Sequence, residues 1–191
     1  MVKFTSRKLT GGPKMGEFSN VKKVCGFYVS SMHLITMILP YIKKETNKDV
    51  KIETILEYNL KENVNNVVAN LIINDKEKEN ILNINWNINK IQKYSNIEKR
   101  LKNISKNEQI NILISGSIKY IEEANTIIEK IINKNINKIN KNKITIINCY
   151  EVKEFDDNIR EILDSHELII NTAGIHKIED IFEDYQKKKA N

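Results

Sequence analysis

Residue types that can do chemistry gather near the C-terminal end of the chain, in the stretch IINCYEVKEFDDNIREILDSHELIINTAG (146–174). It holds Cys149, Glu151, Asp164 and His166. A thiol with a nearby imidazole and carboxylate has the composition of a nucleophile and its base. However, Cys149 ends an apolar run rather than beginning a helix, and free cysteines are common in protein cores. We therefore favour a structural thiol, with catalysis by Cys149 and His166 as the alternative.

A metal site is the second chemistry that these residue types allow, because thiolate and imidazole are zinc ligands. The candidate ligands are Cys25, His33, Cys149 and His166. No two of them lie three or four residues apart, as ligands on one helix would, and the two cysteines form no CxxC pair. We expect no metal and no other cofactor.

Two glycine-containing segments could approach a ligand with their backbone. In ISGS (114–117), Gly116 stands between a predicted strand and a predicted helix, whose first N–H groups could hold an anion. A tight turn with a serine helix cap is the alternative that we favour. In GGPKMGEF (11–18), the glycine spacing is that of a P-loop, but the Lys and Ser/Thr that bind phosphate and magnesium are missing. We expect no P-loop.

Aromatic residues close several of the predicted strands. Tyr28, Tyr58 and Tyr150 each end an apolar run, so their hydroxyls could line one pocket, or they could edge the core and hydrogen-bond locally. Both alternatives remain open from the sequence. Trp86, the only tryptophan, is interpreted as a packing anchor.

The elements that must position these residues alternate along the chain. Apolar, β-branched runs predict strands at 24–29, 50–58, 110–117, 143–150 and 167–174. Helical spacing predicts helices from Ser31, with a kink or early break at Pro40, then in pieces over 60–104, and over 117–132, 156–165 and 178–189. This order predicts an α/β fold: a single three-layer domain with a mainly parallel sheet of about five strands, flanked by helices.

The overall composition bounds the class of protein. With 191 residues, 40% hydrophobic and 29% charged, the chain predicts one globular domain over 21–191 after a flexible basic leader over 1–20. Residues 1–23 contain six basic residues and one acidic residue, which accounts for +5 of the net charge of +6. The remainder lacks the basic face of a nucleic-acid-binding domain, so nucleic acid is an unexpected partner. Asn is so abundant that we give single Asn residues little weight.

The same composition predicts the cellular location. No apolar run reaches the roughly 20 residues that cross a bilayer, and no apolar run follows the basic N-terminus as in a signal peptide. We expect a cytoplasmic protein with no membrane partner, in which both cysteines stay reduced.

Two segments resemble the MEDS sensory-domain family. VCGFYVSSMHLITMILPYI (24–42) is similar to the family's opening strand and helix, and ILISGSIKYIEEANTIIEKII (112–132) to its middle strand and acidic helix. ITIINCYEVKEFDDNIREILDSHELIINTAG (144–174) resembles its C-terminal signature. The matching residues there are Cys149, Tyr150, Glu151, Phe155, Leu163 and His166. The family often has Pro after the His, where this chain has Glu167.

The resemblance, which covers roughly residues 22–175, implies a RecA/Rossmann-like core without a P-loop that senses small molecules. We therefore expect a stand-alone, non-catalytic sensory or regulatory domain that binds an unidentified small molecule or a partner protein. It would act on a signalling or transcription protein in trans, with self-association as one route. The alternatives are a small enzyme that uses Cys149 and His166, and a nucleic-acid accessory protein that acts through the leader.

Parallel sheets bind ligands beyond the carboxyl ends of their strands, and polar residues collect there in this sequence. The residues that we expect to contact the ligand are Tyr28, His33, Ser115, Gly116, Cys149, Tyr150 and Glu151.

Overall fold

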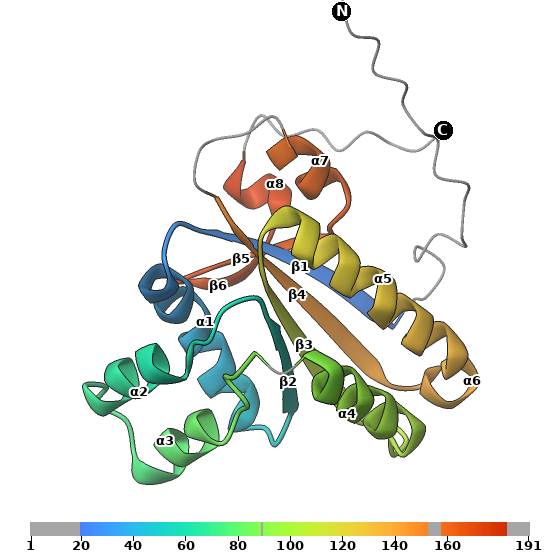
Figure 1. Ribbon diagram of the computed structural model, residues 1–191, viewed down its shortest axis with the longest axis horizontal. Helices are drawn as coiled ribbons and strands as arrows, with labels where there is room; N and C mark the ends of the chain where they lie inside the picture. Colours follow the sequence, from blue (N-terminus) through green and yellow to red (C-terminus); the bar gives the residue numbers. More distant parts are fainter. Residues whose placement is uncertain (1–19, 89, 153–157, 183–191) are drawn as a thin grey trace, which may run out of the picture.

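The computed structural model describes residues 20–88, 90–152 and 158–182, which form a layered α/β structure around one sheet (Figure 1). The sheet has six strands in the order β2-β3-β4-β1-β5-β6. The strands are β1 (Val21–Tyr28), β2 (Lys51–Leu56), β3 (Gln109–Gly116), β4 (Lys143–Glu151), β5 (Leu168–Asn171) and β6 (Gly174–Lys177). The first five pair in parallel, and β6 pairs with β5 in the antiparallel direction.

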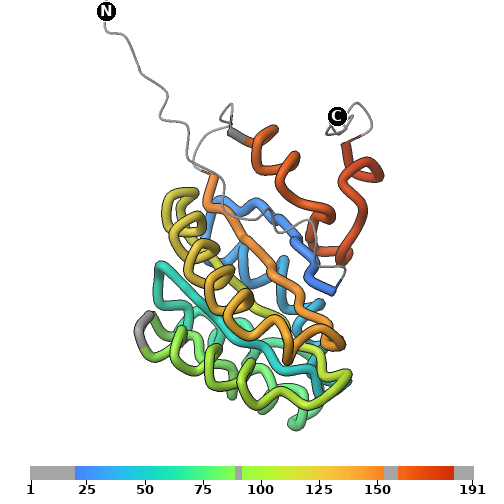
Figure 2. Tube along the Cα trace, turned by 90° about the vertical axis from the view of Figure 1, so that its right-hand side faces the viewer, coloured from blue at the N-terminus to red at the C-terminus, as the bar shows by residue number. Residues whose placement is uncertain are grey.

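Helices cover both faces of this sheet. They are α1 (Ser31–Thr46), α2 (Lys61–Ala69), α3 (Asp75–Leu82), α4 (Lys90–Lys102), α5 (Ile118–Lys134), α6 (Ile136–Ile139), α7 (Asn158–Asp164) and α8 (Ile178–Ile181). Helices α1, α2 and α3 pack on one face, and α4, α5 and α7 on the other. In Figure 2, α4 and α5 run side by side along the second face.

The middle strands are apolar along most of their length because both of their faces are covered. β3 and β4 carry long isoleucine-rich runs, and a β-branched side chain packs well on a pleated surface that is buried on both sides. Alternate residues of β4 enter different cores: Ile147 and Cys149 pack against the α1 face, whereas Ile146 and Tyr150 pack against the α5 face.

The chain leaves the two central strands in opposite directions. From β1 it crosses over the α1 face to the sheet edge at β2, and from β4 it crosses over the α5 face to β5. A right-handed crossover toward one edge of a sheet passes over one face, and a right-handed crossover toward the other edge passes over the opposite face. The carboxyl ends of β1 and β4 therefore form the switch point at which ligands bind in many open α/β sheets.

The predicted fold class is confirmed, with two corrections. A sixth strand was missed, because β6 is only four residues long and none of its residues is fully buried, so it carries little apolar signal. The early helix break at Pro40 is wrong: α1 continues to Thr46, and the burial of Ile38, Leu39 and Ile42 offsets the hydrogen bond that proline removes.

Some predictions fall on residues outside the described part of the chain. They concern the basic leader, the glycine segment at 11–18, Phe155 and most of the closing helix. In the described part, no helix is both long enough and apolar enough to cross a membrane.

Candidate functional site

The carboxyl edge of the sheet, where the sequence predicts a pocket, is held together by its own polar groups. The Ser115 hydroxyl donates to the Tyr28 hydroxyl oxygen at 3.1 Å, and both side chains are buried. Burial raises the pKa of the Tyr28 hydroxyl above its usual range, so this group stays protonated. The pair joins β1 to β3 across β4.

The start of α5 is occupied by a carboxylate of this chain. Glu57, which follows β2, accepts a 2.6 Å hydrogen bond from the Ser117 backbone N–H and a 3.3 Å bond from the Ser117 hydroxyl. Ser117 is the N-cap of the helix, so the prediction of a turn with a serine cap is confirmed. Gly116 permits this approach, because a Cβ there would lie 2.5 Å from Glu57 Oε2. A carboxylate already stands where an anion would bind.

The connection from β1 to α1 consists of Val29 and Ser30 alone. Ser30 is the N-cap of α1 and accepts from the His33 N–H at 3.2 Å. His33 is exposed, and its Nδ1 accepts from the Val29 N–H at 3.4 Å. A two-residue connection is too short to surround a phosphate as a P-loop does.

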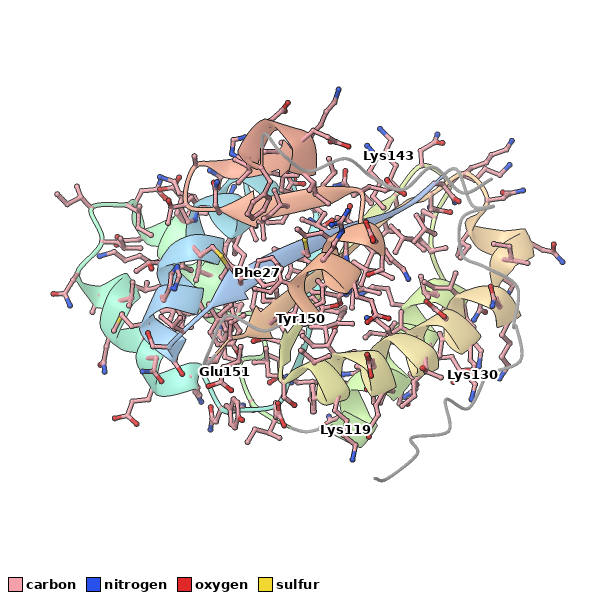
Figure 3. The ribbon with its side chains drawn as sticks, turned by 90° about the horizontal axis from the view of Figure 1, so that it is seen from above. Phe27, Lys119, Lys130, Lys143, Tyr150 and Glu151 are labelled. Carbon is pink, nitrogen blue, oxygen red and sulfur yellow. The ribbon has the colours of Figure 1, made fainter. Side chains whose placement is uncertain are left out.

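The three strand-end tyrosines do not line one pocket. Tyr28 lies in the core under α1, and Tyr58 is 45% exposed, with the Glu151 carboxylate acting on its hydroxyl. Tyr150 lies on the opposite face of the sheet from Tyr28, beside Phe27 (Figure 3). Each therefore edges a core or bonds locally. Trp86 is buried and donates from Nε1 to the Ile81 carbonyl at 2.9 Å, as expected of a packing anchor.

Cys149 and His166 lie on opposite faces of the sheet. Cys149 belongs to the apolar core under α1, while His166 is buried against Tyr150 on the α5 face, with their rings 5.8 Å apart. Burial raises the pKa of the Cys149 thiol far above that of a reactive thiol, and that of Cys25 to about 12. The alternative of a Cys149–His166 catalytic pair is therefore wrong, because strand alternation separates the two side chains.

A groove between α5 and α7 brings together carboxylate, ammonium, amide, hydroxyl and imidazole groups. It has a volume of about 320 Å³, within the range of small-molecule sites, and its floor is formed by β1 and β4. From α5 it is lined by Ile118, Glu122, Asn125, Thr126 and Glu129; from α7 and the residues after it by Glu161, Ile162, Ser165 and His166; from the sheet by Lys23, Asn148 and Tyr150.

A histidine and an asparagine form the floor of this α5–α7 groove. The Asn148 side chain is fully buried in the centre of β4, and its Nδ2 donates to His166 Nε2 at 2.9 Å. His166 Nδ1 faces the Ile162 carbonyl oxygen at 2.7 Å. Because a carbonyl oxygen only accepts, Nδ1 carries the proton and Nε2 accepts. This pair orients the Asn148 amide.

Two carbonyl oxygens in the α5–α7 groove have no hydrogen-bond partner in the described part of the protein. They are Oδ1 of Asn148 and Oδ1 of Asn125, and both are buried. A buried carbonyl without a donor is unfavourable, by about 1–3 kcal/mol. Both unsatisfied atoms are acceptors, so what this groove lacks is hydrogen-bond donors.

The charged side chains of the α5–α7 groove also favour a ligand that donates hydrogen bonds. Its wall residues include the three carboxylates of Glu122, Glu129 and Glu161, and Lys23 contributes its one ammonium. Lys23 pairs with Glu129 at 3.0 Å. Neither Glu122 nor Glu161 forms an ion pair with another described residue. The groove is therefore negative, and its unsatisfied buried polar atoms are acceptors.

The predicted site residues divide between these regions. Tyr28, Ser115, Gly116 and Glu151 lie at the carboxyl edge, and His33 lies beside it on α1. Tyr150 faces the α5–α7 groove, and Cys149 faces neither. Their role in ligand binding stays a prediction.

Sequence reasoning missed Asn148, Asn125 and Lys23. One signal for Asn148 is present, because an amide in the middle of an otherwise apolar strand requires a partner. The abundance of Asn elsewhere in the chain hid it. Within the described residues, no group of three or more His, Cys, Asp or Glu side chains lies close enough to hold a metal ion.

No family model and no curated protein matches the sequence, so the resemblance to MEDS domains stays a prediction. A solved structure that resembles this chain is the ATPase domain of G40P, with a TM-score of 0.44 and 13% identity over 87% of this chain and 73% of that one. The α/β sheet with helices on both faces is the expected fold class. At this identity and TM-score, the likeness assigns no activity to this chain.

The expectation of a stand-alone, non-catalytic sensory domain is at odds with this comparison, because the similar structure is described as an ATPase domain. The physical reason is that a pattern of strands and helices specifies a fold that enzymes and sensors share.

Proposed function

We propose that this protein binds a small organic cation that carries hydrogen-bond donors, in the α5–α7 groove. The observation that carries the proposal is the pair of buried carbonyl oxygens of Asn125 and Asn148, which have no hydrogen-bond partner among the described residues. An ammonium or guanidinium group supplies donors to such oxygens and has no acceptor that would be left unpaired.

The charge around these oxygens supports the same class of ligand. Glu122 and Glu161 stand on opposite walls of the groove, so a cation between them is attracted to both. The apolar side chains of Ile118 and Tyr150 provide contact for a short aliphatic or aromatic body. A carboxylate or phosphate ligand would be repelled by the same walls.

The test is titration of the protein with butylamine, followed by amide NMR and calorimetry, with butyrate as the anionic counterpart. We expect butylamine to shift the resonances of the groove residues and butyrate to leave them unchanged. The double variant Glu122→Gln/Glu161→Gln should weaken butylamine binding about tenfold, since each exposed ion pair contributes up to about 1 kcal/mol.

Glu123→Gln is the matched control, because Glu123 is an exposed carboxylate of the same helix that does not line the groove and acts instead on Tyr94. It should bind butylamine as the unchanged protein does. Equal weakening by Glu123→Gln, or shifts that do not map to the groove, would contradict the proposal and indicate general attraction between charges.

A further inference from the structure

The ion pair between Lys23 and Glu129 lies inside the α5–α7 groove. Lys23 is on β1, where its backbone pairs in register with Ile146 of β4, and its side chain crosses the groove floor to α5. Its Nζ lies 3.0 Å from Glu129 Oε1. The two side chains are 23% and 34% exposed, so the pair is partly screened from water by the groove walls.

This ammonium occupies part of a site that is built for cations. Glu129 is the last groove carboxylate along α5, four residues beyond Asn125 and therefore about 6 Å further along the helix axis. Asn125 and Asn148 mark where the ligand's donors are missing. The lysine ammonium therefore lies in the same groove, next to the position proposed for the ligand.

We infer that Lys23 is a specificity-determining residue, a tethered cation that fills the Glu129 end of the groove and limits the ligand to one positive group. The inference rests on the proposed function and names the substrate class more closely: monocations, in preference to linear diamines. The second ammonium of a four-carbon diamine would reach Glu129 only by displacing Lys23.

The backbone of Lys23 supports a fixed position for this cation. Its carbonyl accepts from the Glu167 N–H at 3.1 Å, which ties β1 to the connection between α7 and β5. The base of the side chain is therefore held by both neighbours of β1 in the sheet. Only the flexible stem and the ammonium are free to adjust when a ligand binds.

The test compares the binding of butylamine with that of diaminobutane, in the unchanged protein and in the variant Lys23→Met. This substitution keeps an aliphatic side chain and removes the charge. The measured quantity is the ratio of the two dissociation constants. Loss of the lysine charge changes the electrostatic potential of the whole groove for both amines, and the ratio separates this general effect from a specific one. We expect the ratio to shift about fivefold in favour of the diamine in Lys23→Met, as one further partly exposed ion pair becomes available.

The double variant Lys23→Met/Glu129→Gln closes the cycle, since it removes the carboxylate that the second ammonium would use. Its ratio should return to that of the unchanged protein. An unchanged ratio in Lys23→Met, or a shift that persists in the double variant, would overturn this inference while leaving the proposed function intact. Failure of both the unchanged protein and Lys23→Met to bind butylamine would overturn the two together.

Discussion

The carboxyl edge of the sheet and the α5–α7 groove differ in how their polar groups are satisfied. At the edge, Ser115 bonds to Tyr28 and Ser117 bonds to Glu57, so these hydroxyls and this carboxylate satisfy one another. In the groove, two carbonyl oxygens lack described partners, and two carboxylates lack described counter-ions. The polar groups of the edge therefore link the strands to one another, whereas the groove keeps polar groups that the proposed ligand would satisfy.

Sheet topology alone does not locate a binding site. The switch point between β1 and β4 falls at the carboxyl edge, as the general rule requires. In this protein two helices that begin at this edge are capped by side chains of the chain itself, Ser30 at α1, which follows β1, and Ser117 with Glu57 at α5, which follows β3. Substitutions at the edge should therefore change stability, and substitutions in the groove should change binding.

Gly116→Ala should have the largest effect on stability. The new Cβ would lie 2.5 Å from Glu57 Oε2 and 2.7 Å from Glu57 Cβ, so the carboxylate must leave Ser117 and the end of β2 must shift. We expect a loss of about 2 kcal/mol in the free energy of unfolding, measured by urea denaturation. Butylamine binding should be unchanged under folding conditions, and a loss of binding would contradict the separation of the two regions.

Tyr28→Phe should have a smaller effect of the same kind. It removes the buried hydrogen bond with Ser115 and leaves the serine hydroxyl without that partner. The free energy of unfolding should fall by about 1 kcal/mol. Tyr58→Phe is the control, because its hydroxyl is exposed and its loss should change stability little. Equal losses in the free energy of unfolding for the two variants would show that burial of the Tyr28 hydroxyl does not determine the effect.

Asn148→Leu should have the smallest effect on stability and a clear effect on binding. It removes the donor to His166 but also removes an unpartnered buried oxygen, so the two contributions nearly cancel. We expect a change below about 1 kcal/mol in urea denaturation, and a weakening of butylamine binding of about tenfold, as for one hydrogen bond to a charged group. A strongly destabilised variant that still binds butylamine would show that Asn148 serves stability rather than binding.

The sheet and its helices were largely predictable, because their signals are local. Isoleucine-rich runs located β3 and β4, and helical spacing located α5 with its buried face. The short strand β6 was missed because its side chains are only half-buried. The separation of α5 and α7 over β4 depends on tertiary packing and has no local sequence pattern, so the groove between them could not be predicted.

Fewer residues of the α5–α7 groove could be predicted, for a related reason. Strand alternation places Cys149 and Asn148 on opposite faces, and the sequence does not say which face is fully covered. The thiol attracted attention because of its reactivity, but it lies in the closed core. The amide beside it, one of many Asn residues, lies on the floor of the groove.

The position of β1 has a consequence for the order in which the chain folds. The first strand of the described chain lies between β4 and β5, and Val24 pairs with Ile147 on one side and with Leu168 on the other. The centre of the sheet therefore depends on contacts between residues more than a hundred positions apart, and closing such long loops slows folding. During synthesis, β1 must wait for the last strands to emerge from the ribosome. The groove, whose floor β1 shares with β4, is completed only then.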